Sequence, residues 1–163
     1  MLFRSDYARP PAPELCELDL SRLVAEVIAL YEQSGARIQA NLQRGTAQVL
    51  GDPDRLRQVI HNLLQNAQDA LSGRNDPRIE VSTEQCDGLV WLRISDNGCG
   101  FPEAIIKGAF EPYVTTKPKG TGLGLAIVKR IIDEHHGTIQ IENRTDKEGG
   151  RGATVRISLP RAA

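Results

Sequence analysis

The sequence predicts an α/β fold, a two-layer sandwich in which a mixed β-sheet is covered on one face by three helices. Two observations support this prediction. Three segments have apolar residues at the three- and four-residue spacing of an amphipathic helix, and short strand-like segments alternate with them along the chain. A chain of 163 residues suffices for one domain with a core, because a domain of this length buries roughly two-thirds of its unfolded surface.

The first fourteen residues are predicted to lie outside this domain. The segment Arg9-Pro10-Pro11-Ala12-Pro13 cannot form a helix or a paired strand, because proline lacks the N–H donor and restricts the residue before it. The preceding Leu2, Phe3 and Tyr7 look like the end of an element that begins upstream. We therefore divide the chain into a linker at 1–14 and a domain at 15–163.

Within the domain, each element follows from apolar spacing and from turn residues. Helices are expected at 19–33, at 52–71, where Asp52 is the N-cap and Pro53 the first helical residue, and at about 122–135, which Gly137 ends. Strands are expected at 15–18, 38–42, 47–50, 79–83, 89–94, 138–142 and 153–159. The segment 101–119 contains prolines and has no strong period, so it is predicted to be a mobile lid.

Charge and composition argue against several classes of protein. The 20 basic and 21 acidic residues give a net charge near −1, which offers no electrostatic argument for binding nucleic acid or an anionic membrane surface. No apolar run approaches the ~20 residues that span a bilayer, and no signal peptide is visible. Three scattered cysteines suggest a reducing cytoplasm rather than a disulfide framework.

The second predicted helix has a polar stripe beside its apolar one. Gln58, Asn62, Asn66 and Asp69 are four, four and three residues apart, so they share one side of the helix. Asparagine is a poor helix former, and two asparagines on one face lower helix stability. A solvated polar face explains Asn62 and Asp69 equally well. For Asn66 we favour a neutral oxygen ligand that completes the octahedral shell of Mg²⁺ beside a triphosphate.

A glycine-containing turn follows the strand expected at 89–94. Asp96 stands at the end of this strand, where its carboxylate could accept a hydrogen bond from the amino group of adenine, which guanine could not donate in the same place. The alternative interpretation is an ordinary Asx-turn carboxylate. Gly98 and Gly100 would let the turn pass beneath the base.

A second glycine-rich segment opens the third predicted helix. Exposed N–H groups and the helix dipole favour phosphate at this end, so Gly122 and Gly124 would lie against the phosphate groups of a ligand. Lys117 and Lys119 flank the segment and could reach the terminal phosphate, although lysines in loops are usually only solvated. One contact for a base and another for phosphates together predict a nucleotide site.

In order, these segments resemble the N, G1, F and G2 boxes of the ATP-binding domain of bacterial sensor histidine kinases. The motifs that carry the resemblance are Asn62-Leu63-Leu64-Gln65-Asn66-Ala67, Asp96-Asn97-Gly98-Cys99-Gly100, Phe110-Glu111-Pro112-Tyr113 and Gly120-Thr121-Gly122-Leu123-Gly124-Leu125. Gly150-Arg151-Gly152-Ala153-Thr154 resembles the last glycine element of the family, and Thr115-Thr116-Lys117 with the proline-rich entry is most similar to nitrogen-regulation sensor kinases. The resemblance covers roughly residues 15–160 and implies the Bergerat ATP-binding fold, with ATP and Mg²⁺ as cofactors.

The resemblance also implies roles for individual residues. Asn66 matches the magnesium-binding asparagine, and its upstream partner Asn62 is an expected catalytic residue together with Lys117. Asp96 matches the aspartate that reads adenine, and Thr154 resembles the residue that assists this contact through water. The aromatic pair that anchors the lid corresponds to Phe110 and Tyr113. The phosphate-wrapping loop corresponds to Gly120, Thr121, Gly122, Leu123 and Gly124.

One departure from the family pattern concerns the contact with phosphate. Many relatives have a basic residue and an aromatic residue three and four positions after the magnesium asparagine, where this chain has Asp69 and Ala70. A phosphate contact from this helix is therefore in doubt, and Lys117 is expected to supply it.

The second departure is the lack of a matching acceptor histidine. A complete kinase has a phosphoacceptor histidine followed by an acidic residue, whereas His61 precedes Asn62 and His135-His136 stands at a helix end, where cationic side chains are common. The chain is therefore expected to be the catalytic module of a larger kinase, with residues 1–14 as the stub of its dimerisation helix and linker. It would transfer the γ-phosphoryl group of ATP to a histidine on a separate dimerisation domain, for relay to a response regulator. The parent kinase could be membrane-anchored, but no membrane or nucleic-acid contact is expected from this segment.

Three other functions remain open at this point. An ATP hydrolase of the same superfamily would have a glutamate where Asn62 stands, and an amide cannot act as a general base. A serine kinase of the anti-sigma-factor type fits the length, but the proline-rich entry and the lid argue against it. A non-catalytic nucleotide-sensing module is the third alternative.

Overall fold

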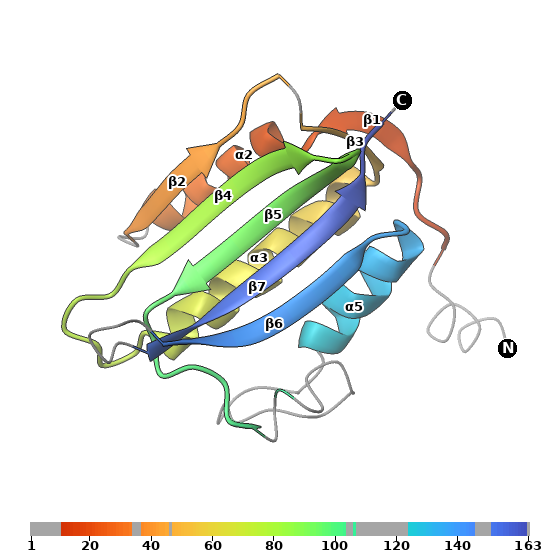
Figure 1. Cartoon of the computed structure of the whole chain (residues 1–163). Helices are drawn as coiled ribbons and strands as arrows, with labels where there is room; N and C mark the ends of the chain where they lie inside the picture. The colour runs from red at the N-terminus through yellow and green to blue at the C-terminus, as the bar shows by residue number, and fades with distance from the viewer. Residues whose placement is uncertain are drawn as a thin grey trace, which may run out of the picture.

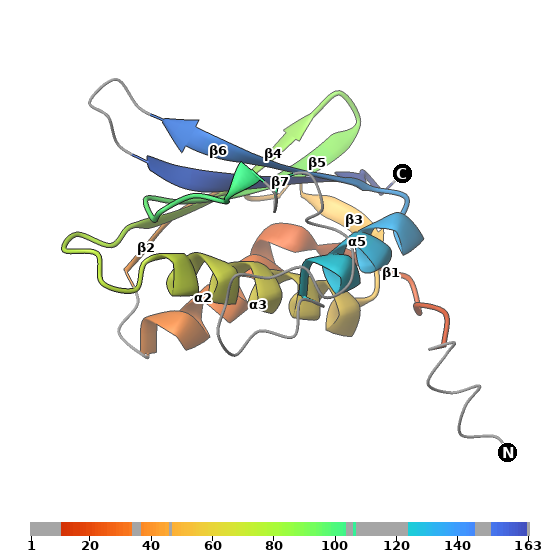
Figure 2. The same cartoon turned by 90° about the horizontal axis from the view of Figure 1, so that it is seen from below.

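The computed structural model describes residues 11–33, 37–45, 47–103, 106, 124–145 and 151–162 of the chain. Among these residues, five strands form the main sheet in the order β2-β4-β5-β7-β6, and three helices cover one of its faces (Figures 1 and 2). The elements are β2 (Ile38–Leu42), β4 (Ile79–Cys86), β5 (Leu89–Asp96), β6 (Thr138–Thr145), β7 (Arg151–Pro160), α2 (Leu20–Gln33), α3 (Pro53–Ala70) and α5 (Gly124–Glu134). The sheet is mixed, because β2 and β4 are parallel and the other neighbours are antiparallel. The predicted two-layer α/β sandwich is confirmed.

The two shortest strands lie outside the main sheet. β1 (Cys16–Asp19) and β3 (Gln48–Gly51) form a separate two-stranded antiparallel sheet. In it, Cys16 lies opposite Gly51 and Asp19 opposite Gln48. The strands predicted at 15–18 and 47–50 are therefore present, each shifted by one residue. Their pairing brings the start of the domain to Gly51, two residues before α3 begins.

The strands of the main sheet extend further than their apolar runs. β4 and β5 continue to a hairpin turn at Asp87 and Gly88, which both have positive φ angles, of 53° and 77°. β5 also includes Asp96, two residues beyond the predicted end, because the backbone of Asp96 still pairs with Ile79 on one side and Ala153 on the other. Backbone pairing thus carries the sheet into polar residues that hydrophobic patterning alone does not detect.

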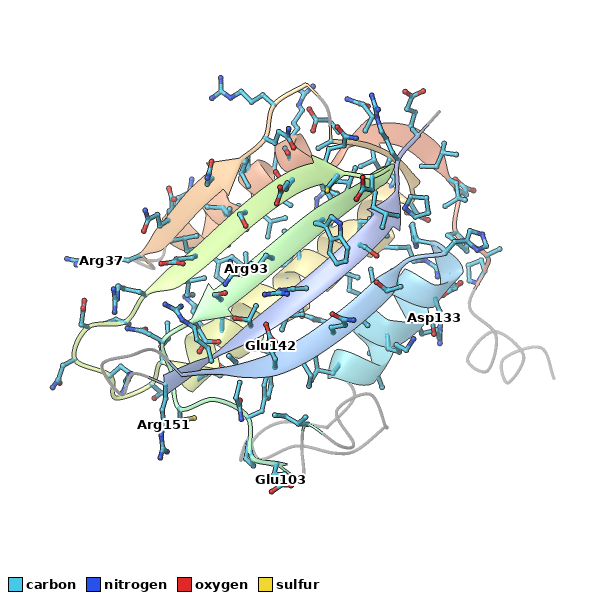
Figure 3. All side chains as sticks on the ribbon, viewed as in Figure 1. Arg37, Arg93, Glu103, Asp133, Glu142 and Arg151 are labelled. Carbon is cyan, nitrogen blue, oxygen red and sulfur yellow. The ribbon has the colours of Figure 1, made fainter. Side chains whose placement is uncertain are left out.

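Alternation along the strands divides the sheet into a core face and an outer face. The core face packs on the apolar stripe of α3, whose buried residues are Leu56, Val59, Ile60, Leu63, Leu64 and Ala67. These residues have the three- and four-residue spacing of the predicted apolar stripe, and Ala70 at the end of the helix is half-buried. The outer face is polar: Figure 3 shows Arg93 and Glu142 on it, and Glu142 forms an ion pair with Arg156 at 3.1 Å.

The N-terminus of α3 is closed by its predicted cap. Asp52 has extended backbone angles, and its carboxylate accepts hydrogen bonds from the N–H groups of Asp54 and Arg55 at 3.1 and 3.3 Å. Pro53 occupies the first turn, where a missing N–H removes no helical hydrogen bond. The sequence signal for this helix start is confirmed in each part.

The C-terminus of α5 ends differently from the prediction. The left-handed residue is His136, with φ of 60°, and not Gly137. The N–H of His136 donates a hydrogen bond to the carbonyl of Asp133 at 3.0 Å, and the N–H of Gly137 donates one to the carbonyl of Ile132 at 2.9 Å. These two hydrogen bonds form a Schellman motif. Gly137 is needed for packing instead, because an added Cβ would lie 2.3 Å from the carbonyl oxygen of Ser158.

We expect His136→Gly to stabilise the domain. A side chain in the left-handed region costs the folded state roughly 1–2 kcal/mol, and glycine removes this strain. Because glycine also gives the unfolded chain more conformational entropy, the net gain in the free energy of unfolding should be about 0.5–1 kcal/mol. Thermal unfolding should show a rise in melting temperature of a few degrees for His136→Gly. The control His136→Ala removes the imidazole but keeps the Cβ, so equal melting temperatures for the two variants would contradict the strain.

Candidate functional site

Asn62 and Asn66 lie on the side of α3 that faces α5. They are four residues apart, and Arg55, seven residues before Asn62, shares their side of the helix. Arg55 forms an ion pair with Glu134 of α5 at 3.6 Å, which gives the direction of this side. Both asparagines are half-buried, whereas Gln58 and Asp69 of the predicted stripe are exposed.

Asp69 is engaged in local contacts on the same helix. Its carboxylate accepts a hydrogen bond from Gln65 Nε2 at 3.0 Å, and the side chain is exposed. The exposed position agrees with the solvated interpretation of Asp69. The polar stripe therefore narrows to Asn62 and Asn66 as candidates for ligand contact.

Asp96 is a buried carboxylate at the C-terminal end of β5. The residue is 6% exposed, and its Oδ1 accepts a hydrogen bond from the N–H of Gly98 at 2.9 Å. Burial raises the pKa of Asp96, although the N–H groups of Gly98 and Ala153 and the charges of Arg144 and Arg74 act in the opposite direction. The local Asx turn is thus formed, and the same carboxylate is a desolvated acceptor of the kind that a specific donor would satisfy.

The turn after Asp96 is held by contacts on both sides. The side chain of Asn97 accepts the N–H of Arg78 and donates to the carbonyl of Asp76, each at 2.7 Å. Gly98 lies against the end of α3, where an added Cβ would be 2.4 Å from the carbonyl oxygen of Ala70. The turn that follows Asp96 therefore lies directly against the C-terminal end of the asparagine helix.

Gly100 is the residue at which the chain leaves this turn. Its φ is 78°, and an added Cβ would lie 2.9 Å from Asn143 Oδ1. Asn143 in turn brackets the next residue, accepting the N–H of Phe101 at 2.6 Å and donating to its carbonyl at 2.7 Å. Asn143 is a site residue that the sequence does not reveal, because it is 42 residues away from Phe101 and belongs to no motif.

Thr154 lies on the opposite face of the sheet from Asp96. The register places Ala153 opposite Asp96 and Thr154 opposite Ser95, so alternation directs Thr154 to the outer face. Its hydroxyl is 2.9 Å from the hydroxyl of Ser95, and the residue is 2% exposed. This geometry does not support the predicted assistance of an adenine contact by Thr154. A difference of one residue along a strand reverses the face, and Ala153 is the residue beside Asp96.

Gly152 is a second site residue to which the sequence motifs assign no role. An added Cβ there would be 2.0 Å from the carbonyl oxygen of Asp96, so β7 approaches the end of β5 closely at this point. The signal was present in the sequence, as the second glycine of Gly150-Arg151-Gly152.

The remaining candidates divide into one residue within the described part of the chain and several outside it. Gly124 is the first residue of α5, and an added Cβ there would meet nothing within 4 Å. Most of the predicted lid lies outside the described residues, as do Phe110, Tyr113, Lys117, Lys119, Gly120, Thr121, Gly122 and Leu123. Within the described ranges, no group of three or more histidine, cysteine or acidic residues could hold a metal ion.

Comparison with protein families shows what this arrangement belongs to. Residues 51–163 match the family described as histidine kinase-, DNA gyrase B- and HSP90-like ATPase. The chain belongs to this ATPase family. The matched region includes α3, the Asp96 turn and Gly152, so the predicted family resemblance is confirmed on the segments that carry it.

Sensor kinases are prominent among the similar proteins. The NtrY-like sensor histidine kinase of Rickettsia conorii is 39% identical over 140 residues, which are 85% of this chain and 23% of that protein. The nitrogen regulation protein NtrY of Azorhizobium caulinodans is 35% identical over 161 residues, 95% of this chain and 20% of that protein. This ATPase-family chain therefore spans about a quarter or less of the length of these relatives.

The fold of this ATPase-family domain agrees with a solved kinase. The catalytic domain of histidine kinase ThkA superposes with a TM-score of 0.78 at 33% identity, covering 91% of this chain and 96% of that one. ThkA solved in complex with the response regulator protein TrrA also matches, with a TM-score of 0.77, 27% identity, and coverage of 98% and 46%. In the described part of the chain, no helix has the length and apolar character needed to cross a membrane.

We expect Gly152→Ala to damage both stability and the site. The added methyl group would meet the backbone of Asp96, which must shift, and such overpacking typically costs 1–3 kcal/mol. Thermal unfolding should show a lower melting temperature, and calorimetry should show weaker ATP binding, because the displaced residue is Asp96 itself. For stability, Gly124→Ala is the matched control because its Cβ meets open space. A wild-type melting temperature in Gly152→Ala would contradict the close approach.

Proposed function

We propose that this domain binds ATP with Mg²⁺ and transfers the γ-phosphoryl group to a histidine on a separate dimerisation domain. The observation that carries the proposal is the contact between the Asp96 turn and α3. A buried carboxylate suited to a base is thereby held at the end of the helix whose α5-facing side presents Asn62 and Asn66. The ATPase family supports ATP as the nucleotide.

The residues fit ATP in three places. Asp96, buried and desolvated, would accept a hydrogen bond from the amino group of adenine. The amide oxygen of Asn66 would be a ligand for Mg²⁺, which when bound neutralises negative charge on the phosphates. Gly124 at the start of α5 would offer its N–H and the helix dipole to phosphate, with Gly120, Thr121, Gly122 and Leu123 forming the loop before it.

Transfer to a partner is favoured over hydrolysis by the residue one turn before Asn66. Asn62 is an amide, which cannot take a proton from water as a glutamate would. We assign to Asn62 a role in positioning the phosphates and to Lys117 the neutralisation of the transferred group. Catalysis then consists mainly of orientation and charge stabilisation, and the nucleophile comes from the partner.

None of the chain's own histidines is suited to be the acceptor. His135 is buried at 2% exposure, and His136 closes the end of α5. His61 is half-buried in α3, with its Nδ1 3.4 Å from the hydroxyl of Tyr31. We therefore place the acceptor on a dimerisation domain that residues 1–14 connect to this one.

The wider setting of the proposal comes from the similar sensor kinases. Because the complex of ThkA contains a response regulator protein, we propose that phosphate is relayed from the acceptor histidine to such a regulator. We also propose a cytoplasmic location, for which the three free cysteines, all exposed, are supporting evidence.

Acid stability of the product is the test of the reaction. Incubated with labelled ATP, the isolated chain should stay essentially unlabelled and hydrolyse ATP slowly. Addition of a dimerisation domain from an NtrY-like kinase should produce an acid-labile phosphohistidine on that domain, slowly, because the reactants meet by diffusion. Rapid phosphate release by the isolated chain would favour a hydrolase. Acid-stable phosphoserine on an added protein would favour a serine kinase, and ATP binding without either product would favour a sensing module.

A further inference from the structure

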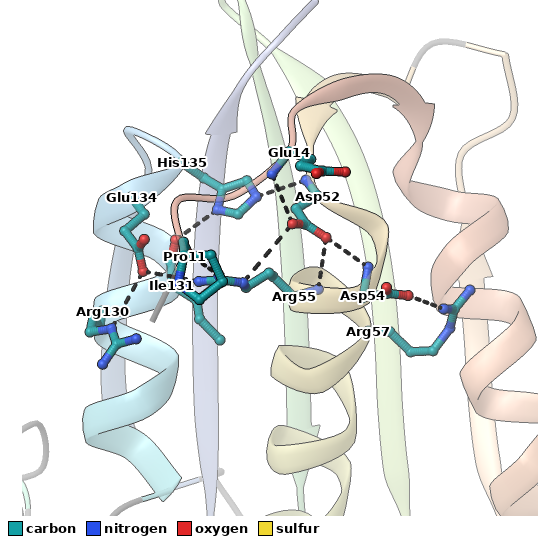
Figure 4. A network of polar contacts seen from close by, with 10 residues as sticks. All are labelled: Pro11, Glu14, Asp52, Asp54, Arg55, Arg57, Arg130, Ile131, Glu134 and His135. Carbon is teal, nitrogen blue, oxygen red and sulfur yellow. Dashed lines mark hydrogen bonds and ion pairs between the residues drawn. The ribbon is translucent and has the colours of Figure 1, made fainter. Parts of the chain in front are cut away.

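The segment that enters the domain is fastened to the start of α3. The N–H of Glu14 donates to Asp52 Oδ2 at 3.0 Å, and Arg55 Nη2 donates to the carbonyl oxygen of Pro11 (Figure 4). Two residues after Glu14, Cys16 begins the pairing with Gly51. The side chains of Asp52 and Arg55 therefore extend the attachment of the chain beyond the last strand pair. We call residues 11–14 the linker strap.

The same two residues join the end of α5 to the start of α3. Arg55 Nη1 lies 3.6 Å from Glu134 Oε1, with the two side chains only 17% and 28% exposed. The N–H of Asp52 donates to His135 Nε2 at 3.0 Å, and His135 Nδ1 lies 2.7 Å from the carbonyl oxygen of Ile131. A neutral imidazole with its proton on Nδ1 satisfies both bonds. Strap, α3 and α5 thus meet in one polar network (Figure 4).

Protonation chemistry supports the attachment of the strap. Burial raises the pKa of Asp52, but the N–H groups of Glu14, Arg55 and Asp54 outweigh this effect and hold the pKa below its ordinary value. One of these donors belongs to the strap, so docking and ionisation of Asp52 favour each other.

The two helices in this network are those that border the proposed nucleotide site. Asn62 lies nine residues into α3 from Pro53, and α5 has Gly124 at its far end, about 16 Å from the network at 1.5 Å per residue. Helices are rigid over such lengths, so the position of their joined ends affects the separation of Asn66 from Gly124. Fixing the joined ends restrains both sides of the site.

We propose that the network of Asp52, Arg55, Glu134 and His135 is a docking site for the linker strap, and that strap docking and ATP binding stabilise each other. This inference rests on the proposed function. The two-state element is the strap, docked or released. By linkage, any strengthening of ATP binding by docking equals the strengthening of docking by ATP. A movement of the segment before residue 11 would then change ATP affinity without any contact with the nucleotide.

The test uses matched variants that remove one strap contact at a time. Glu14→Pro deletes the N–H that Asp52 accepts, while Glu14→Ala keeps it. Arg55→Gln removes the contacts with Pro11, Asp52 and Glu134. Arg57→Gln, two residues further along α3, removes ion pairs with Asp54 of the same helix and Glu26 of α2 and leaves the strap intact. Calorimetry should show ATP binding at least about fivefold weaker in Glu14→Pro and Arg55→Gln, the lower end of typical coupling, and unchanged in both controls.

Hydrogen exchange in the wild-type chain gives the reciprocal readout. ATP should slow exchange of the Glu14 N–H, and Arg55→Gln should accelerate it without nucleotide. If ATP binds the wild type but all four variants match it, the coupling is overturned and the proposed function stands. If ATP does not bind the wild type, the proposed function itself fails. Should Arg55→Gln fail to fold, the pair Glu14→Pro and Glu14→Ala decides the matter.

Discussion

Asp96→Ala is expected to abolish the adenine contact and to weaken ATP binding by at least about tenfold. A hydrogen bond to a charged group typically contributes about 1.5–3 kcal/mol, which corresponds to roughly ten- to more than a hundred-fold in affinity. The variant also leaves the N–H of Gly98 without its carboxylate acceptor, so the turn that contacts α3 should loosen. Isothermal calorimetry measures the loss directly. In the wild type, GTP should bind far more weakly than ATP, because guanine has a carbonyl oxygen where adenine has the amino group that would donate to Asp96.

The control for this experiment is a carboxylate on the opposite face of the sheet from Asp96. Glu80 is exposed on the outer face of the neighbouring strand β4, and Glu80→Gln removes one negative charge there. Its ATP affinity should equal that of the wild type. Unchanged affinity in Asp96→Ala would disprove the adenine assignment, whereas equal losses in both variants would point to a general effect of charge.

Asp96 should also limit the stability of the nucleotide-free domain. Burial raises the pKa of Asp96 in the folded state, so its contribution to stability is fully present below the unfolded pKa and is lost as pH rises through the folded pKa. Asp96→Asn has no such dependence. Its melting temperature should match the wild type at low pH, where the carboxyl is protonated, and exceed it by a few degrees at neutral pH. A constant difference across pH would contradict the buried charge.

Local signals predicted the helices and the layers of this fold well. The apolar spacing of α3, its Asp52 cap and Pro53 all concern neighbouring residues, and the structure confirms each of them. The strand ends were less predictable, because residues such as Asp96 join the sheet through backbone pairing with Ala153, which no side-chain pattern reports.

Contacts between distant segments explain what the sequence could not provide for the site. Thr154 was chosen from a motif, but its face depends on register, and a difference of one residue places Ala153 beside Asp96 instead. The sequence indicates that His135 is one of the cationic side chains common at helix ends. The structure shows it buried and accepting a hydrogen bond from Asp52, 83 residues away. Such a bond has no signature in local sequence.

Asn66→Ala is expected to remove most of the effect of Mg²⁺ on ATP binding and to slow phosphotransfer by roughly a hundredfold. The amide oxygen would be a protein ligand in an octahedral shell that phosphate oxygens and water otherwise complete. Without this ligand the metal is no longer fixed relative to α3, so the charge on the transferred group is neutralised less well. Calorimetry with and without Mg²⁺, and transfer to an added dimerisation domain, measure the two effects separately.

Gln65→Ala is the neighbouring control, because Gln65 is exposed and contacts Asp69 rather than the α5 side of the helix. It should retain the full Mg²⁺ effect. Asn66→Asp tests whether the neutral charge of the amide matters. The variant keeps an oxygen ligand for the metal but adds a negative charge beside the triphosphate. Its ATP binding should be weakest without Mg²⁺ and should recover when the metal is added. If the wild type binds ATP equally well with and without Mg²⁺, Asn66 has no role as a metal ligand. If Mg²⁺ strengthens ATP binding as much in Asn66→Ala as in the wild type, another residue is the metal ligand.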